Sequence, residues 1–118
     1  MLVLTRRLNE RIVLPELHTT IQVVALNQQQ VRIGIDDFAR KALGPINEVI
    51  APSHGLTIKR GETLFTVKHG SDIVHFAAPL SGRVTLENNS LQSDATPVSD
   101  SPYDRGWICM IQPSDLIQ

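Results

Sequence analysis

The residues with the most chemical potential lie in one short string, Val67-Lys68-His69-Gly70-Ser71-Asp72. Lys68 offers an amine that can form an amide, and Ser71 offers a hydroxyl. Gly70 can supply the positive φ angle that the first position of a type II′ turn requires, so we expect Gly70-Ser71 to be the two-residue loop of a β-hairpin. Ser71 then lies at the tip of the hairpin, and Lys68 lies on the side of its ascending strand.

The turn fixes the register of this predicted hairpin. It pairs His69 with Asp72, Lys68 with Ile73, Val67 with Val74 and Phe65 with Phe76. Two apolar pairs then stack on one face, which supports the register. A group that must swing between several active sites needs an attachment point at the tip. The simplest interpretation of Lys68 is therefore a solvated strand lysine, because most lysines are exposed.

The remaining titratable and nucleophilic residues form no catalytic or metal-binding pattern. The histidines lack the spacing of metal ligands; they are His18, His54, His69 and His75. His69, Ser71 and Asp72 are the residue types of a catalytic triad, but neighbours around a two-residue turn cannot adopt its geometry. Cys109 lies in an apolar strand, where a buried, inert thiol is the usual outcome. We therefore expect neither an enzyme nor a metal site.

The elements that must position the hairpin are mostly strands. The predicted strands cover residues 2–4, 11–14, 19–26, 31–35, 46–50, 63–68, 73–77, 83–86 and 107–111. A short helix over residues 38–43 follows an N-cap at Asp36-Asp37 and ends at Gly44-Pro45. Residues 88–104 are polar and hold two prolines, which predicts a long loop. Pro113-Ser114-Asp115 predicts the cap of a last helical turn. Short strands at close spacing indicate a barrel or a sandwich.

Composition limits the partners and the compartment. A chain of 118 residues favours one domain, and a net charge of −1 gives no global field that attracts nucleic acid. Cys109 is the single cysteine, so no internal disulfide forms and a reducing compartment fits best. The N-terminus has no secretory pattern, and no apolar stretch approaches the roughly 20 residues of a membrane span. We expect a soluble, cytoplasmic protein.

From residue 31 onward the chain resembles the glycine cleavage system H protein family, which are lipoyl-bearing carriers. The matching segments are residues 31–39, 42–44, 59–62, 78–82, 101–108 and 113–116, of which the C-terminal two are the most specific. The resemblance implies an all-β fold, a barrel-sandwich hybrid of the H-protein or lipoyl type, over residues 31–118.

The family's lipoyl-lysine lies in a string like V-K-A-A-S-D, eight residues before the proline of A-P-x-S-G. Matching that string places the lysine at Lys68, but three residues are then lost before it and three gained after it. Matching from Gly61 to Pro79 needs no gap and places Ser71 at the lipoyl position. Serine has no amine, so this match, which agrees with the hairpin register, predicts a scaffold without lipoate and without any other cofactor. Lys68 is the alternative lipoyl site.

The first residues, Met1 to Glu10, resemble the start of the carbon storage regulator family, small RNA-binding translational regulators. The match continues over residues 12–13, 20–23 and 30–35, and spans residues 1–36. In that family a Leu-Thr-Arg-Arg segment binds RNA loops with a GGA core, and the residues that match it are Leu4, Thr5, Arg6 and Arg7. The family's second basic strand, which also forms its dimer, has no counterpart here. The simpler interpretation of the arginines is a charged edge strand.

The two resemblances overlap at Val31 to Ile35, which predicts one continuous structural unit from segments 1–36 and 31–118. We predict a non-enzymatic H-protein-like scaffold whose regulator-like β arm binds RNA and acts in post-transcriptional regulation. One alternative is a lipoyl carrier of a glycine-cleavage-like system, modified on Lys68. Another is an unlipoylated docking adaptor for a lipoyl-handling enzyme. The expected partners are thus a GGA-containing RNA or such an enzyme, with no membrane and with the oligomeric state left open.

Overall fold

The computed structural model describes residues 11–25, 30–100 and 105–114. The strand expected at residues 2–4 and the candidate RNA-binding residues (Leu4, Thr5, Arg6 and Arg7) lie outside these residues, so they have no structural account here. The described elements are β1 (Arg11–Leu14), the 3-10 helix η1 (Pro15–Leu17), β2 (Thr19–Ala25), β3 (Gln30–Ile35), α1 (Asp37–Leu43), β4 (Glu48–Ile50), β5 (Thr57–Ile58), β6 (Thr63–His69), β7 (Asp72–Ala77), β8 (Gly82–Glu87), α2 (Ser90–Ser93), α3 (Thr96–Asp100) and β9 (Cys109–Pro113).

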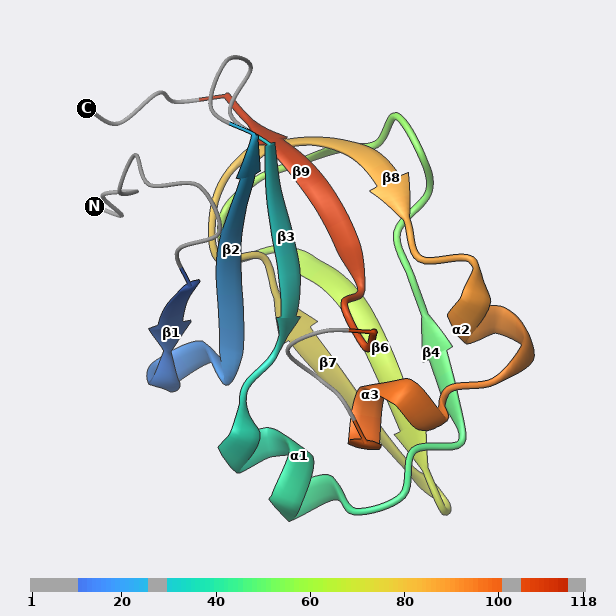
Figure 1. The fold of residues 1–118 in the computed structure, drawn as a ribbon. Helices are drawn as coiled ribbons and strands as arrows, with labels where there is room; N and C mark the ends of the chain where they lie inside the picture. Colours follow the sequence, from blue (N-terminus) through green and yellow to red (C-terminus); the bar gives the residue numbers. More distant parts are fainter. Residues whose placement is uncertain (1–10, 26–29, 101–104, 115–118) are drawn as a thin grey trace.

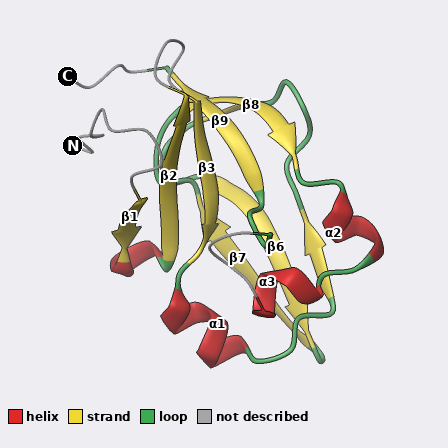
Figure 2. Cartoon of the chain, viewed as in Figure 1, coloured by secondary structure: helices red, strands yellow, loops and turns green. Residues whose placement is uncertain are grey.

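The strands form two antiparallel sheets, with short helices at their periphery (Figure 2). One sheet has the order β1-β2-β3-β9-β8-β5, and the other has the order β4-β6-β7. The turn between β6 and β7 lies at the end of the molecule where α1 and α3 also lie (Figure 1). The expected all-β class with short helices is confirmed.

Alternating apolar residues explain the larger sheet. Val31, Ile33 and Ile35 on β3 are fully buried, and the strand pairs Ile33 with Ile21 of β2. Val31 also lies opposite Ile111 of β9. Because directly opposite residues share a face of the sheet, these side chains form one continuous apolar layer against the three-stranded sheet.

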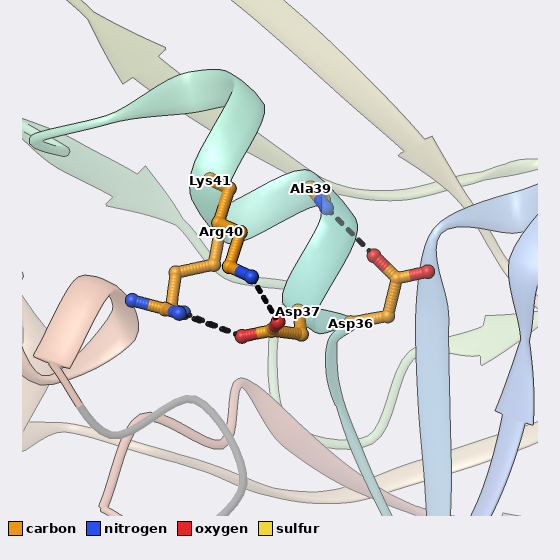
Figure 3. A network of polar contacts seen from close by, with 5 residues as sticks. All are labelled: Asp36, Asp37, Ala39, Arg40 and Lys41. Carbon is orange, nitrogen blue, oxygen red and sulfur yellow. Dashed lines mark hydrogen bonds and ion pairs between the residues drawn. The ribbon is translucent and has the colours of Figure 1, made fainter.

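Helix α1 begins and ends as its sequence predicts. The Asp36 carboxylate accepts a hydrogen bond from the Ala39 N–H at 2.8 Å, which caps the first turn (Figure 3). Gly44 ends the helix with a φ of +67°. On the exposed face, the Asp37 carboxylate lies 2.7 Å from an Arg40 nitrogen and 3.3 Å from Lys41 Nζ (Figure 3). The hydrogen bonds from these two cations hold the pKa of Asp37 below its usual value.

The loop predicted at residues 88–104 is wrong in part, because residues 90–93 and 96–100 form α2 and α3. Each helix buries one apolar side chain, Leu91 of α2 and Val98 of α3, and Ala95 between the two helices is also buried. Asn88 ties the segment to the residues that precede β9, because its Nδ2 donates to the carbonyl oxygens of Arg105 (3.0 Å) and Trp107 (2.7 Å).

Strand β9 ends at Pro113, and the Ser114 N–H donates to the Ser81 carbonyl oxygen at 3.0 Å. The helical turn expected after these residues lies outside the part of the chain that the structure describes. The two-residue strand β5 was not expected. It is too short to show alternation, and its pairing with β8 depends on contacts far away in the sequence.

Candidate functional site

The hairpin of β6 and β7 has the register that the sequence predicts. His69 lies opposite Asp72, Lys68 opposite Ile73, Val67 opposite Val74 and Phe65 opposite Phe76. The rings of Phe65 and Phe76 stack with centroids 4.7 Å apart and planes 7° apart. Gly70 has a φ of +59°, and His18 is the one non-glycine residue with a positive φ in the described part of the chain. A positive φ at the first loop residue alone is what a type II′ turn requires.

Ser71 lies at the exposed tip of this hairpin, next to the exposed Asp72. His69 Nε2 lies 3.9 Å from Asp72 Oδ2, so the two side chains face each other across the turn. The Ser71 hydroxyl can be esterified in principle, but it cannot form an amide. The tip therefore presents no amine.

His69 and Asp72 flank the loop, and Lys68 and Ile73 form the next residue pair. Lys68 lies on β6, the central strand of the three-stranded sheet. Its neighbours directly opposite are Glu48 on β4 and Ile73 on β7, so the three side chains share the outer face of the sheet. Lys68 Nζ lies 3.4 Å from Glu48 Oε1, and 41% of the lysine side chain is exposed. This amine is within reach of solvent, beside a carboxylate.

Asn47 and Glu48 are site residues that the sequence did not reveal. The Asn47 N–H donates to the Lys68 carbonyl oxygen at 2.8 Å, and Asn47 Oδ1 accepts from the Gly70 N–H at 2.6 Å. The pairing of β4 with β6 brings them to the hairpin across about 20 residues of sequence, and no local motif signals such a pairing.

Amide attachment needs a lysine, and the sequence contains three: Lys41, Lys59 and Lys68. Lys41 lies on α1, where it pairs with Asp37, and Lys59 lies in the turn after β5. Lys68 is thus the lysine of the hairpin. A carboxylic acid joined to its Nζ would extend from the outer face of the β4-β6-β7 sheet.

A pocket of about 300 Å³ opens between η1, α1 and the edge strand β7; among its lining residues are Leu17, Leu43 and Phe76. In the described part of the chain, no group of three or more potential ligands (His, Cys, Asp or Glu) is placed to hold a metal. Within the same residues, no helix has the length and hydropathy needed to cross a membrane.

Comparison with known proteins gives a consistent result. Residues 17–118 match the family model described as "Glycine cleavage H-protein". A glycine cleavage system H protein from Anoxybacillus flavithermus is 38% identical over 93 residues, which cover 79% of this chain and 73% of that protein. The corresponding protein of Coprothermobacter proteolyticus is 40% identical over 97 residues, covering 80% and 74%. The crystal structure of a glycine cleavage system H protein from Mycobacterium marinum matches with a TM-score of 0.77 and 29% identity, over 86% of this chain and 82% of that one.

These matches overturn the predicted function. The RNA-binding regulator is wrong, because the family match runs from residue 17 through the second and third strands, and the relatives bear the name of glycine cleavage proteins. The resemblance of residues 1–36 to carbon storage regulators finds no support in these comparisons.

The same matches overturn the expectation that the chain carries no cofactor. The family that matches is the one whose resemblance implied a lipoyl group on a lysine. The ungapped alignment placed Ser71, which has no amine, at the lipoyl position and therefore predicted a scaffold without lipoate, with Lys68 as the alternative site.

Proposed function

Because the chain belongs to the glycine cleavage H-protein family, we propose that it is a lipoyl carrier of a glycine-cleavage-type system, with lipoate joined to Lys68. H proteins are non-catalytic components, so the protein is not an enzyme. Its role is presentation: the protein positions an attached group, and glycine-cleavage enzymes, as the proposed partners, carry out the reactions on it.

The observation that carries the proposal is the Lys68 amine on the β6–β7 hairpin, at the centre of the three-stranded sheet. With 41% of its side chain exposed, Lys68 can form an amide with the carboxyl group of lipoate. Bound lipoate supplies a disulfide that accepts and passes on a substrate fragment. The protein contributes a rigid base for this arm, because the stacked Phe65 and Phe76 rings and the backbone pairing of β6 with β4 and β7 fix the hairpin.

Ser71 has a different role in this proposal. It stays unmodified at the tip, where it is exposed to a docking enzyme, and the lipoyl arm leaves the hairpin one residue pair behind the turn. The arm therefore starts from a sheet face rather than from the extreme end of the molecule.

The test is the intact mass of the full chain after incubation with lipoate, ATP and a lipoate–protein ligase. We expect a gain of one lipoyl unit in the wild type and in Lys41→Arg, and no gain in Lys68→Arg. A wild type that gains no mass would contradict the carrier function. The geometry would then favour docking of the H-protein scaffold without lipoate, since Ser71 occupies the tip.

We also propose that segments 1–36 and 31–118 form one structural unit. The shared sheet supports this, because β1, β2 and β3 belong to the same six strands as β8 and β9. A single cooperative unfolding transition, seen alike by fluorescence and circular dichroism, is the expected result.

A further inference from the structure

Two consecutive residues, Asn47 and Glu48, contact the end of the hairpin at three points. Asn47 binds the backbone on both sides of His69, through the Lys68 carbonyl oxygen (2.8 Å) and the Gly70 N–H (2.6 Å). Glu48 Oε1 lies 3.4 Å from Lys68 Nζ. One short segment thus holds both the turn and the amine of the proposed attachment site.

The sheet enforces this arrangement. Lys68 lies on the central strand, so it has a neighbour on each side of the same face, Glu48 and Ile73. Ile73 offers no polar group to the ammonium, and 59% of it is exposed. The carboxylate of Glu48 is therefore the charged group that the pairing of the strands places beside Lys68.

Acylation of Lys68 starts from the neutral amine. The lone pair of the neutral nitrogen attacks the carbonyl carbon of an activated acyl compound, such as an acyl ester or acyl adenylate. The new C–N bond forms, the alkoxide or phosphate leaving group departs with the bonding electrons, and the nitrogen proton passes to solvent. An ammonium held by a carboxylate at 3.4 Å must first lose a proton, and its nitrogen must turn toward the acyl compound.

We propose that Asn47 and Glu48 form a clamp on the hairpin, in which Asn47 fixes the turn and Glu48 restrains Lys68 and limits its acylation. Both act as positioning residues. The inference rests on the proposed function only for lipoate itself, since the clamp controls the reactivity of the Lys68 amine toward any acylating compound.

The test is acetylation of the full chain by an N-hydroxysuccinimide ester, quantified at each lysine by peptide mass spectrometry. In Glu48→Gln we expect Lys68 to react about two- to fivefold faster, the range that an exposed ion pair provides, while Lys59 is unchanged. Asp37→Asn is the matched control, because it removes the partner of Lys41 (3.3 Å) and should raise labelling at Lys41 only. Glu48→Asp, which withdraws the carboxylate by one methylene, should give an intermediate rate even if Glu48→Gln folds poorly.

The Asn47 half of the clamp has its own readout. Asn47→Ala removes the acceptor of the Gly70 N–H, so exchange of that amide with solvent should accelerate, whereas Asn47→Asp keeps an acceptor and should preserve slow exchange. Unchanged Lys68 labelling in both Glu48 variants, or unchanged Gly70 exchange in Asn47→Ala, would overturn the clamp.

Labelling also separates the clamp from the proposed function. Faster acetylation of Lys68 in Glu48→Gln together with no lipoyl gain in the wild type would support the clamp and reject the carrier. A lipoyl gain in the wild type with unchanged acetylation of Lys68 in Glu48→Gln would support the carrier and reject the clamp.

Discussion

At the scale of single residues, the shape of the hairpin depends on Gly70. A glycine at this position predicts a positive φ, which the structure shows at +59°. The turn that follows from it sets the register of eight paired residues. The second loop residue, Ser71, has no such requirement. The tip therefore tolerates different side chains at position 71, and the chemistry presented there is independent of the fold.

Replacement of Gly70 by alanine should destabilise the protein by about 1 to 2 kcal/mol, because a positive φ is costly for residues with a Cβ. The cost is conformational, since a Cβ at Gly70 would have no heavy atom within 4 Å beyond its chain neighbours. Urea unfolding monitored by circular dichroism measures the change. Ser71→Ala is the control, with an expected effect within about 0.5 kcal/mol. Equal losses in the two variants would speak against the type II′ turn.

Cys109 should make stability fall at alkaline pH. Burial, with a smaller contribution from the charge of Glu87, raises the pKa of the thiol from its ordinary value of 9.0 to about 12. As the pH rises, the thiol ionises at a lower pH in the unfolded chain than in the folded one. Its contribution to the free energy of unfolding is therefore complete below pH 9 and is lost as the pH rises toward about 12. The free energy of unfolding should drop by up to about 1.4 kcal/mol per pH unit in that window.

The comparison that isolates this effect is wild type against Cys109→Ala, with the free energy of unfolding measured between pH 8 and pH 10.5. The variant is less stable at pH 8 because it loses core packing. Its stability should nevertheless depend less steeply on pH than that of the wild type. If stability fell equally steeply with pH in both proteins, the Cys109 thiol would have the same pKa in the folded and the unfolded chain.

At the scale of elements, local signals account for what the sequence could predict. Gly70 fixed one hairpin, alternating apolar residues marked β3, and Asp36 with Gly44 marked both ends of α1. The helices between residues 90 and 100 were missed because their polar residues and Pro97 outweighed three buried apolar positions.

The candidate site was predictable only in part, for a related reason. The hairpin residues are contiguous, so Lys68 and Ser71 could be found in one string. Asn47 and Glu48 reach them through strand pairing, which no local pattern specifies. The regulator-like interpretation of residues 1–36 relied mainly on the opening string of residues 1–10, and the family match from residue 17 onward outweighs it.

The cap of α1 provides the prediction for an element. Asp36 is buried, and its carboxylate accepts from the Ala39 N–H at 2.8 Å, so Asp36→Ala should cost about 1 to 2 kcal/mol of stability. Asp36→Asn keeps an acceptor and should cost less. Thermal or urea unfolding of the three proteins at pH 7 gives the comparison. If Asp36→Ala and Asp36→Asn destabilise the protein equally, the carboxylate does not stabilise the protein by capping α1.

At the scale of the whole molecule, two sheets hold one short hairpin at an end of the protein, and Lys68, the proposed attachment site, lies just behind its tip. A ligase that recognises such a protein can respond to the exposed tip or to the individual position of Lys68. The two kinds of recognition can be told apart, because Lys68 lies directly opposite Glu48 of the clamp, whereas Ser71 pairs with neither clamp residue. Moving the lysine separates them.

The variant Lys68→Arg with Ser71→Lys keeps one positive charge at position 68 and places the only hairpin amine at the tip. We expect lipoate–protein ligase to modify it at least as fast as the wild type, because an amine at position 71 has no opposing carboxylate on β4 and is more exposed. The rate of lipoyl mass gain is the measurement, with Lys68→Arg as the unmodified control. If the double variant keeps its circular dichroism spectrum but gains no mass, the ligase recognises position 68 and its neighbours rather than the tip of the hairpin.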